Sequence, residues 1–256
     1  MQENAAKKKL ARGDAIYGTS LEIALDPEMP LLLSAAGLDF FFIDTEHSPA
    51  DYHQIRALCR SAKYANIAAL VRVTQNEPHL ITRALDSGAM GIIVPRVHSA
   101  ADAQTAVEKM KYPPTGNRGF GMHSIIHDFR FTNAEQEMSS ANHETMTVLQ
   151  IESAKGLAAV NEIAKTSSVD ALFVGPYDLT ISMGIAEQFE CQQFWEAIDR
   201  VIHACNAAGI AAGIQSPRLD LLCEAKKRGM KLLLYASDSS ALLDGYRNGL
   251  ARFRDC

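Results

Sequence analysis

Two carboxylates of the sequence follow neighbouring apolar runs in a pattern that suits a divalent cation. Glu152 ends the run 147–152, and Asp178 lies three residues beyond Gly175, which ends the run 170–175. A carboxylate in an otherwise buried strand is costly unless a positive charge compensates it. Oxygen ligands with room for water suit Mg²⁺ or Mn²⁺, and Co²⁺ is compatible with them. The pair therefore predicts a metal site in which Glu152 and Asp178 are the ligands.

Three more polar side chains end or follow apolar runs and would complement such a metal. Arg72 interrupts the run 67–73, and its planar guanidinium can bind a substrate carboxylate through two hydrogen bonds. His47 follows the run 38–44 and can transfer protons near neutral pH, with Asp44 orienting its ring. A metal and an arginine together can stabilise the enolate that forms from a 2-oxo acid.

Each of these residues also has a structural interpretation that involves no chemistry. Glu152 could pair with a lysine at the edge of the fold, and Asp178 could cap the helix that follows it. Arg72 could belong to a structural ion pair, and His47 could be an ordinary loop residue. The convergence of all four on one place is what favours the catalytic interpretation.

Two other chemistries fit parts of the sequence. His123 and His127 have the i,i+4 spacing of a zinc pair, but the HExxH pattern with its glutamate is absent. Lys155 could form a Schiff base, although it lies beyond the apolar run rather than on it. Both rank below metal-assisted catalysis.

The elements that must position these side chains are eight short apolar runs, which alternate with segments of helical apolar spacing. Alternating strands and helices predict parallel β–α–β units, and eight units in about 250 residues is the size of one (β/α)8 TIM barrel. A doubly wound open sheet is the alternative, but no GxGxxG motif follows the first run. The runs are 15–20, 38–44, 67–73, 90–95, 147–152, 170–175, 209–214 and 230–236, and the helical segments include 51–64, 100–112 and 216–229.

The active site of such a barrel lies at the carboxyl ends of its strands, where these polar residues fall. Strand residues alternate between two faces, so Gln150 shares the face of Val148 and Glu152, and Leu149 lies on the other. The segment 113–146 is too long for a simple connection. We expect it to be a functional loop or to carry short elements of its own.

Composition argues against several classes of protein. The 256 residues are 47% hydrophobic and 21% charged, and the net charge of −5 argues against binding to nucleic acid. No apolar stretch reaches the length of a membrane span, and no apolar signal-peptide core is present. Five scattered cysteines without a CxxC pair suit reduced thiols in a cytoplasmic protein. We expect a single TIM-barrel domain over residues 1–256, with residues 1–12 as a flexible polar N-terminus.

Six motifs, in order and spacing, resemble those of the class II pyruvate-dependent aldolases of the HpcH/HpaI family. The type is that of the 2,4-dihydroxyhept-2-ene-1,7-dioate and 2-dehydro-3-deoxyglucarate aldolases, and the similarity extends from about residue 13 to the C-terminus. The motifs are "FFFIDTEHSPAD", "LVRV", "ALDSGAMGIIVPRVHSAADA", "YPPTGNRGFG", "VLQIESAKGL" and "ALFVGPYDLTISMG".

This resemblance implies a barrel of the phosphoenolpyruvate/pyruvate type and a homo-oligomer. The implied assembly is a hexamer, a trimer of dimers, in which the C-terminal helix is exchanged between subunits. Asp86 would help to build the site across a subunit boundary. Glu152 and Asp178 fall on the positions of the metal ligands, for which Mg²⁺, Mn²⁺ or Co²⁺ is expected.

The resemblance also implies a role for each of the remaining site residues. His47 falls on the catalytic base, and Asp44 on the carboxylate that supports it. Arg72 falls on the residue that holds pyruvate and stabilises the enolate. Other positions that would meet the substrate are Gln150, Gly175, Pro176, Tyr177 and Gln215.

The implied reaction is the reversible aldol cleavage of a 4-hydroxy-2-oxo acid to pyruvate and an aldehyde, the work of a carbon–carbon lyase. One alternative is decarboxylation of oxaloacetate, which passes through the same enolate. A second alternative is a non-catalytic barrel that binds keto acids, which would not need the base His47. The expected partners are small molecules and further copies of the chain.

The sequence departs from the family pattern near the acceptor. Tyr177 stands where a small residue is usual, Gln215 replaces an apolar residue, and "YASD" replaces a "VGVD"-like run. Leaving the Gln215 amide unpaired would cost roughly 1–3 kcal/mol. With Arg96 near the same opening, Gln215 predicts that hydroxylated or carboxylated short aldehydes are preferred over alkyl aldehydes. Alternatively, Gln215 points to solvent and selects nothing.

Overall fold

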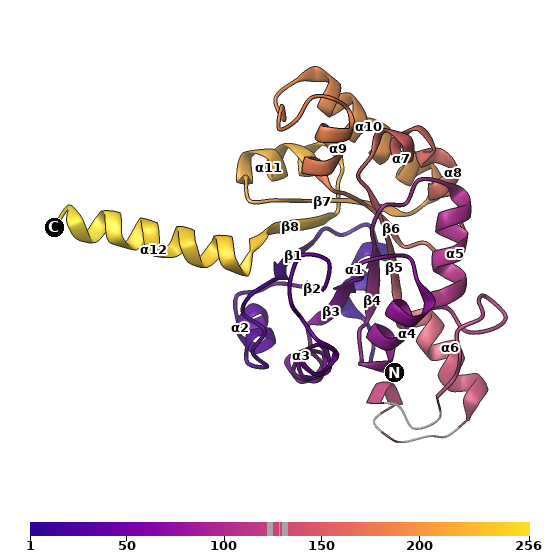
Figure 1. Ribbon diagram of the computed structural model, residues 1–256. Helices are drawn as coiled ribbons and strands as arrows, with labels where there is room; N and C mark the ends of the chain where they lie inside the picture. The colour runs from indigo at the N-terminus through magenta and orange to yellow at the C-terminus, as the bar shows by residue number, and fades with distance from the viewer. Residues whose placement is uncertain (122–124, 128, 130–132) are drawn as a thin grey trace.

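A closed barrel of eight parallel strands forms the centre of the protein (Figure 1). The computed structural model describes residues 1–121, 125–127, 129 and 133–256. Each strand pairs with its neighbour in chain order, and the eighth pairs with the first, which confirms the predicted (β/α)8 barrel. The strands are β1 (Ile16–Leu21), β2 (Phe40–Asp44), β3 (Ala68–Arg72), β4 (Gly91–Val94), β5 (Met146–Ile151), β6 (Ala171–Val174), β7 (Ala211–Ser216) and β8 (Leu232–Ser237).

Helices surround the barrel and connect successive strands. One of these helices is α3, which begins with a capping box formed by Asp51 and Gln54. It ends at Asn66, whose backbone has the left-handed conformation. The helices are α1 (Ala5–Ala11), α2 (Met29–Ala35), α3 (Tyr52–Ala65), α4 (Pro78–Asp86), α5 (Ala100–Met110), α6 (Ala134–Glu144), α7 (Ala154–Ala158), α8 (Val160–Ala164), α9 (Pro176–Ser182), α10 (Gln192–Ala208), α11 (Leu219–Arg228) and α12 (Asp238–Arg254).

The strand alternation expected from the sequence divides the apolar residues into two cores. Phe40 and Phe42 of β2 belong to the core inside the barrel, whereas Phe41 and Ile43 belong to the core between strands and helices. On β5, Val148 faces inward in the same way. Because the inner cluster fills the barrel, polar side chains at inward positions can reach solvent only at the strand ends.

The N-terminus is not the flexible polar segment that we expected. Residues Ala5–Ala11 form α1, and Ala6 joins the core inside the barrel at its amino-terminal end. The Asn4 side chain is fully buried, caps the helix at the N–H of Lys7 and donates to the carbonyl oxygens of Met90 and Glu144. The lysines suggested a solvated tail, but Ala6 and Leu10 share one helical face and pack against the barrel.

The long segment 113–146 carries short elements of its own, which is one of the two possibilities that the sequence suggested for it. A 3₁₀ turn occupies Ile125–His127, and α6 follows at Ala134–Glu144. The zinc pair considered from the sequence cannot be described, because His123 lies outside the described residues.

The C-terminal helix α12 projects away from the barrel (Figure 1). A capping box of Ser237 and Ser240 begins it, directly after β8. Its exposed surface includes five large apolar side chains, namely Leu242, Leu243, Tyr246, Leu250 and Phe253. Among the described residues, no helix is both long enough and apolar enough to cross a membrane.

Candidate active site

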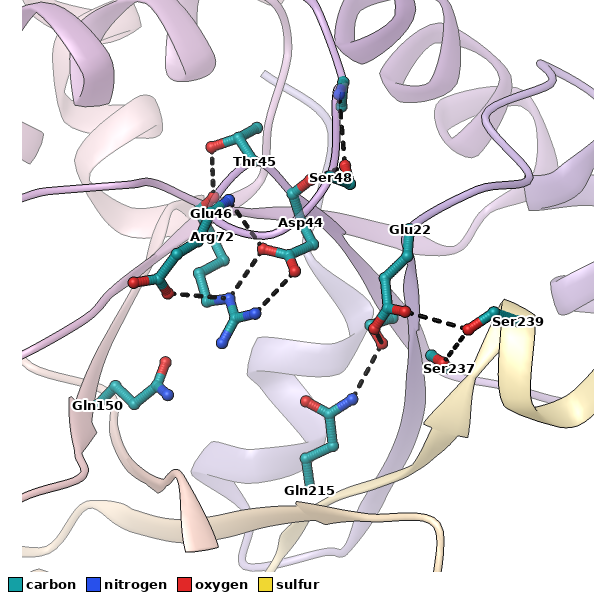
Figure 2. Close-up of polar contacts among 12 residues, drawn as sticks. Glu22, Asp44, Thr45, Glu46, Ser48, Arg72, Gln150, Gln215, Ser237 and Ser239 are labelled. Carbon is teal, nitrogen blue, oxygen red and sulfur yellow. Dashed lines mark hydrogen bonds and ion pairs between the residues drawn. The ribbon is translucent and has the colours of Figure 1, made fainter. Parts of the chain in front are cut away.

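Polar side chains meet at the carboxyl ends of the strands (Figure 2). They come from inward positions of β2, β3, β5 and β7, where the apolar filling of the barrel ends. The four residues are Asp44, Arg72, Gln150 and Gln215. The period-two alternation of each strand, which begins with apolar residues inside, delivers these side chains to one end of the barrel.

Arg72 is held between two carboxylates. Its Nε and Nη2 atoms donate to Asp44 Oδ1 at 2.9 Å and Oδ2 at 2.7 Å, and Nε lies 3.5 Å from Glu46 Oε2. Burial alone would lower the pKa of Arg72, but the hydrogen bond and charge of Asp44 outweigh it, and the pKa is raised. No acceptor among the described residues is bonded to Nη1, so this N–H group can still bind a ligand.

Glu152 is almost buried and lies close to other acidic groups. Its Oε1 accepts from the backbone N–H of Arg96 at 2.7 Å, and its Oε2 accepts from Gln150 Nε2 at 2.5 Å. Burial raises the pKa of Glu152; the Arg96 hydrogen bond opposes this, and the charges of Glu46 and Asp178 add to it. A carboxylate that is desolvated next to like charges is stabilised by a cation.

Gln150 and Gly175 complete the surroundings of Glu152. The buried Oε1 of Gln150 has no hydrogen-bond partner, and such an orphaned acceptor fits a site that takes a ligand. A Cβ on Gly175 would lie 2.7 Å from Gln150 Nε2 and 3.0 Å from Glu152 Oε2. Glycine thus keeps a space open beside the two polar side chains.

The donor set fits a hard divalent cation with few protein ligands. Glu152 and Asp178 supply carboxylate oxygens, and no described group of three or more His, Cys, Asp or Glu residues is arranged to hold a metal. Mg²⁺ and Mn²⁺ sites of this kind use one or two carboxylates and complete their shells with water and substrate oxygens. The residues present therefore fit such an ion.

Two neighbouring pockets share Asp178 as a wall. One has a volume of about 290 Å³ and is lined by Arg72 and Gln150; the other, of about 300 Å³, is lined by His47 and Glu152. The candidate base and the candidate substrate-binding arginine thus lie on two sides of the same carboxylate. The first pocket also contains the other expected substrate contacts, namely Gly175, Pro176, Tyr177 and Gln215.

Among the described residues, Asp44 bonds to Arg72 rather than to His47, which it was expected to support. Both oxygens of Asp44 are used by Arg72, and Asp44 Oδ1 also accepts from the backbone N–H of Glu46 at 3.0 Å. His47 is exposed and has no hydrogen-bond partner among the described residues. The sequence spacing suggested a pair of Asp44 and His47, but the register of β2 and β3 sets Asp44 directly opposite Arg72.

Two further expected residues lie outside the first pocket. Asp86 ends α4, on the amino-terminal side of β4, and pairs with Arg118 at 2.6 Å. Arg96 is exposed with its Nη2 on Glu46, and it lines the pocket of His47 rather than that of Gln215. Within one chain, neither is brought to Gln215.

Sequence reasoning missed Glu22, which lines the same pocket as Arg72 and Gln215. Glu22 is the first residue after β1, at the carboxyl end of the strand. The signal that identifies the other residues, a polar side chain directly after an apolar strand, is therefore present at Glu22 as well. Lys155, the Schiff-base candidate, lies exposed on α7.

Comparison with known proteins identifies the family. The family model described as "HpcH/HpaI aldolase/citrate lyase" matches residues 24–243. A hydroxypyruvate/pyruvate aldolase of Paraburkholderia phytofirmans is 32% identical over 255 residues, 98% of each chain. A 2-dehydro-3,6-dideoxy-6-sulfogluconate aldolase of Pseudomonas putida is 33% identical over 91% of each chain. The crystal structure of an HpcH/HpaI aldolase from Desulfitobacterium hafniense superposes with a TM-score of 0.92 at 33% identity, covering 98% of this chain and 96% of the other.

The resemblance noted in the six motifs is thereby confirmed over nearly the whole chain. Relatives named as aldolases also support an enzyme rather than a barrel that only binds keto acids. The chain therefore belongs to the HpcH/HpaI aldolase/citrate lyase family and is a carbon–carbon lyase.

Proposed function

We propose that the protein is a divalent-metal-dependent aldolase that reversibly cleaves a 4-hydroxy-2-oxo acid to pyruvate and an aldehyde. The names of its relatives include aldolases of hydroxypyruvate or pyruvate and of keto-deoxy sugar acids. The observation that carries the proposal is the pairing of Arg72 with Asp44 in a pocket whose wall includes Asp178. This arrangement offers an oriented cation where an enolate oxygen would form.

Glu152 and Asp178 are the residues that would hold the metal. When bound, a divalent ion would supply positive charge against the oxygens of the 2-oxo acid. Arg72 would direct Nη1 at the same substrate, with its orientation fixed in advance by Asp44. Gln150 and the backbone of Gly175–Tyr177 would contact the substrate carboxylate.

His47 is the proposed base, acting through a water molecule. It takes the proton of the C4 hydroxyl, the C4 oxygen forms the carbonyl of the aldehyde, and the C3–C4 bond breaks. The electron pair of that bond passes to C3 and the C2 oxygen, which gives the enolate that Arg72 stabilises. The aldehyde leaves first, and protonation at C3 then gives pyruvate.

The test is a screen of aldehydes with pyruvate after the protein is treated with chelator. We expect mass analysis to find adducts only when Mg²⁺, Mn²⁺ or Co²⁺ is returned. Titration with Mn²⁺ in the absence of substrate should show binding that Glu152→Gln weakens and that Glu162→Gln, at an exposed position of α8, leaves unchanged. Full turnover in chelator, together with a lysine adduct trapped by borohydride and pyruvate, would instead indicate a Schiff base.

Oxaloacetate decarboxylation is a second candidate for the same site. The observation that favours it is the contrast between the oriented Arg72 and the exposed, unpartnered His47, because decarboxylation needs the enolate half but no base. Its test is His47→Ala, assayed with oxaloacetate and in aldol addition. If His47→Ala loses aldol addition but keeps oxaloacetate decarboxylation, the site can decarboxylate without the base that the aldol reaction needs.

A homo-oligomer belongs to the same proposal. The five exposed apolar residues of α12 form a surface that a neighbouring subunit would cover. Exchange of α12 within dimers, and three dimers in a hexamer, would bury this surface and bring Asp86 to a neighbour's site.

A further inference from the structure

We propose that Glu22 determines acceptor specificity: it selects uncharged, hydroxyl-bearing aldehydes and rejects aldehydes that carry a carboxylate. This inference rests on the proposed aldolase function and concerns the part of the pocket beyond pyruvate. Glu22, Gln215 and Arg72 line one pocket of about 290 Å³ at the carboxyl ends of the strands.

The backbone of Glu22 is fixed by a buried carboxylate. Asp238, the first residue of α12, is 5% exposed and accepts from three successive N–H groups after β1. The donors are Glu22 at 3.1 Å, Ile23 at 3.0 Å and Ala24 at 2.6 Å. A loop that would otherwise move is therefore held against the end of β8, and Glu22 stays beside the pocket.

The side chain of Glu22 is fixed as well. Ser20 Oγ donates to Glu22 Oε1 at 3.2 Å, and Ser239 Oγ donates to Oε2 at 3.1 Å. Figure 2 shows Glu22 beside Ser239, on the side of the pocket where Gln215 lies. Each carboxylate oxygen keeps capacity for another donor, so the wall of the pocket presents a negative, hydrogen-bond-accepting surface.

Gln215 adds a second acceptor with a defined orientation. Its Nε2 donates to Ser20 Oγ at 2.9 Å and to the backbone oxygen of Ala236 at 3.2 Å. A flipped amide would place two acceptors, Oε1 and the Ala236 carbonyl, against each other, so this orientation is favoured. The Oε1 atom has no donor among the described residues, and in Figure 2 it lies on the side of Gln150.

Beyond the portion that would hold pyruvate, the pocket therefore presents hydrogen-bond acceptors and a negative charge to its ligand. A hydroxyl can donate to Gln215 Oε1 or to Glu22, whereas an alkyl group leaves Gln215 Oε1 without a donor in the complex. A carboxylate would meet the charge of Glu22. Arg72, the cation that lines this pocket, is paired with Asp44, and its remaining Nη1 donor serves the 2-oxo acid in the proposed function; Arg96 lies in the other pocket.

The structure thus narrows the acceptor prediction made from the sequence. That prediction admitted hydroxylated and carboxylated aldehydes alike, because Arg96 was expected near Gln215. With Glu22 beside Gln215 and Arg96 bonded to Glu46, the hydroxylated class remains and the carboxylated class is rejected.

The experiment compares kcat/KM for two matched pairs of aldehydes, with pyruvate and the metal that supports turnover. Glycolaldehyde against propanal tests the hydroxyl, and succinic semialdehyde against pentanal tests the carboxylate. In wild type we expect glycolaldehyde to exceed propanal by about tenfold, and succinic semialdehyde to fall below pentanal. Glu22→Gln, which keeps the size and removes the charge, should raise the ratio of succinic semialdehyde to pentanal about tenfold.

Two further variants complete the design. Glu28→Gln makes the same charge change at an exposed position before α2 and should alter neither ratio. Gln215→Leu should lower the ratio of glycolaldehyde to propanal toward one, and it tests the hydroxyl while the bonds of Asp238 to the Glu22 backbone and the charge of Glu22 are kept.

The outcomes separate this inference from the function on which it rests. A wild type that prefers succinic semialdehyde, or a Glu22→Gln variant with both ratios unchanged, overturns the role of Glu22 while the aldolase function stands. Absence of turnover with every aldehyde, in a protein that binds Mn²⁺, overturns the proposed function itself.

Discussion

Arg72 and Asp44 face each other across neighbouring strands, and the arginine donates to both oxygens of the carboxylate at 2.9 and 2.7 Å. The Asp44 side chain is 1% exposed and that of Arg72 is 12% exposed, so solvent screens the pair weakly. Two parallel hydrogen bonds fix the plane of the guanidinium. The remaining donor of Arg72 can therefore be oriented before any substrate binds.

Arg72→Lys should damage catalysis far more than folding. Lysine keeps the positive charge but cannot reproduce the planar, two-pronged contact with Asp44. We expect kcat to fall by a factor on the order of 10²–10³, as for the loss of one oxyanion donor. Steady-state kinetics and thermal melting measure the two effects, and Arg60→Lys on the exposed side of α3 is the control. Near-normal kcat in Arg72→Lys would remove the arginine from its proposed role.

Gly175→Ala should weaken ligand binding without unfolding the barrel. The new Cβ would lie within 3.0 Å of atoms of both Gln150 and Glu152, so one of them must move. A displacement of about 1 Å in a catalytic group can cost on the order of 10²-fold in rate. We expect kcat/KM to fall by that order and Mn²⁺ affinity to drop.

The matched control for Gly175→Ala is Gly119→Ala, where a Cβ meets no atom within 4 Å. A Gly175→Ala variant whose kcat/KM and Mn²⁺ affinity are both unchanged would contradict the prediction.

Lys111 should make stability depend on pH. The pKa of Lys111 is lowered to about 7, chiefly by burial and then by the charges of Lys7 and Arg118, against the opposing charge of Asp170. In the unfolded chain the pKa returns to about 10. Between these values the unfolded state binds more protons, so the free energy of unfolding should rise from about pH 7 to about pH 10.

Chemical denaturation of the wild type and of Lys111→Met across this range tests the dependence. The neutral lysine amine has two N–H donors for the carbonyl oxygens of Asn142 and Thr145, which it reaches at 2.9 and 2.7 Å. The variant should lose the rise with pH, whereas Lys227→Met, at an exposed position of α11, should keep it. Parallel curves for all three proteins would show that Lys111 does not titrate in this way.

The apolar surface of α12 should hold subunits together. Leu250→Glu combined with Phe253→Glu places two charges on that surface, where burial against a neighbour would be costly. We expect light scattering to show an oligomer for wild type and a smaller species for the double variant. Asn248→Glu, on the more polar side of the helix, should leave the mass unchanged. A fully active wild-type monomer at micromolar concentration would refute the assembly.

The sequence by itself determined the barrel and the residue types at its carboxyl end. Apolar runs of strand length alternate with helical segments, and the period of two sends Gln150 and Arg72 to the inner face whatever the tertiary details. The residues that would bind the metal and the substrate could be identified in this way because each ends a strand or follows its end within a few residues. The same local signal was present at Glu22.

The partners of those side chains were decided only by the tertiary structure. Asp44 bonds to Arg72 and not to His47 because the register between β2 and β3 sets the first two side by side. The ordered α1 also depends on a distant surface, since the open end of the barrel provides the apolar contact that Ala6 covers. Glu22 is fixed beside Gln215 by Asp238, which lies more than two hundred residues further along the chain. Such pairings follow from strand register and barrel closure, which bring remote residues together and which no local pattern of side chains encodes.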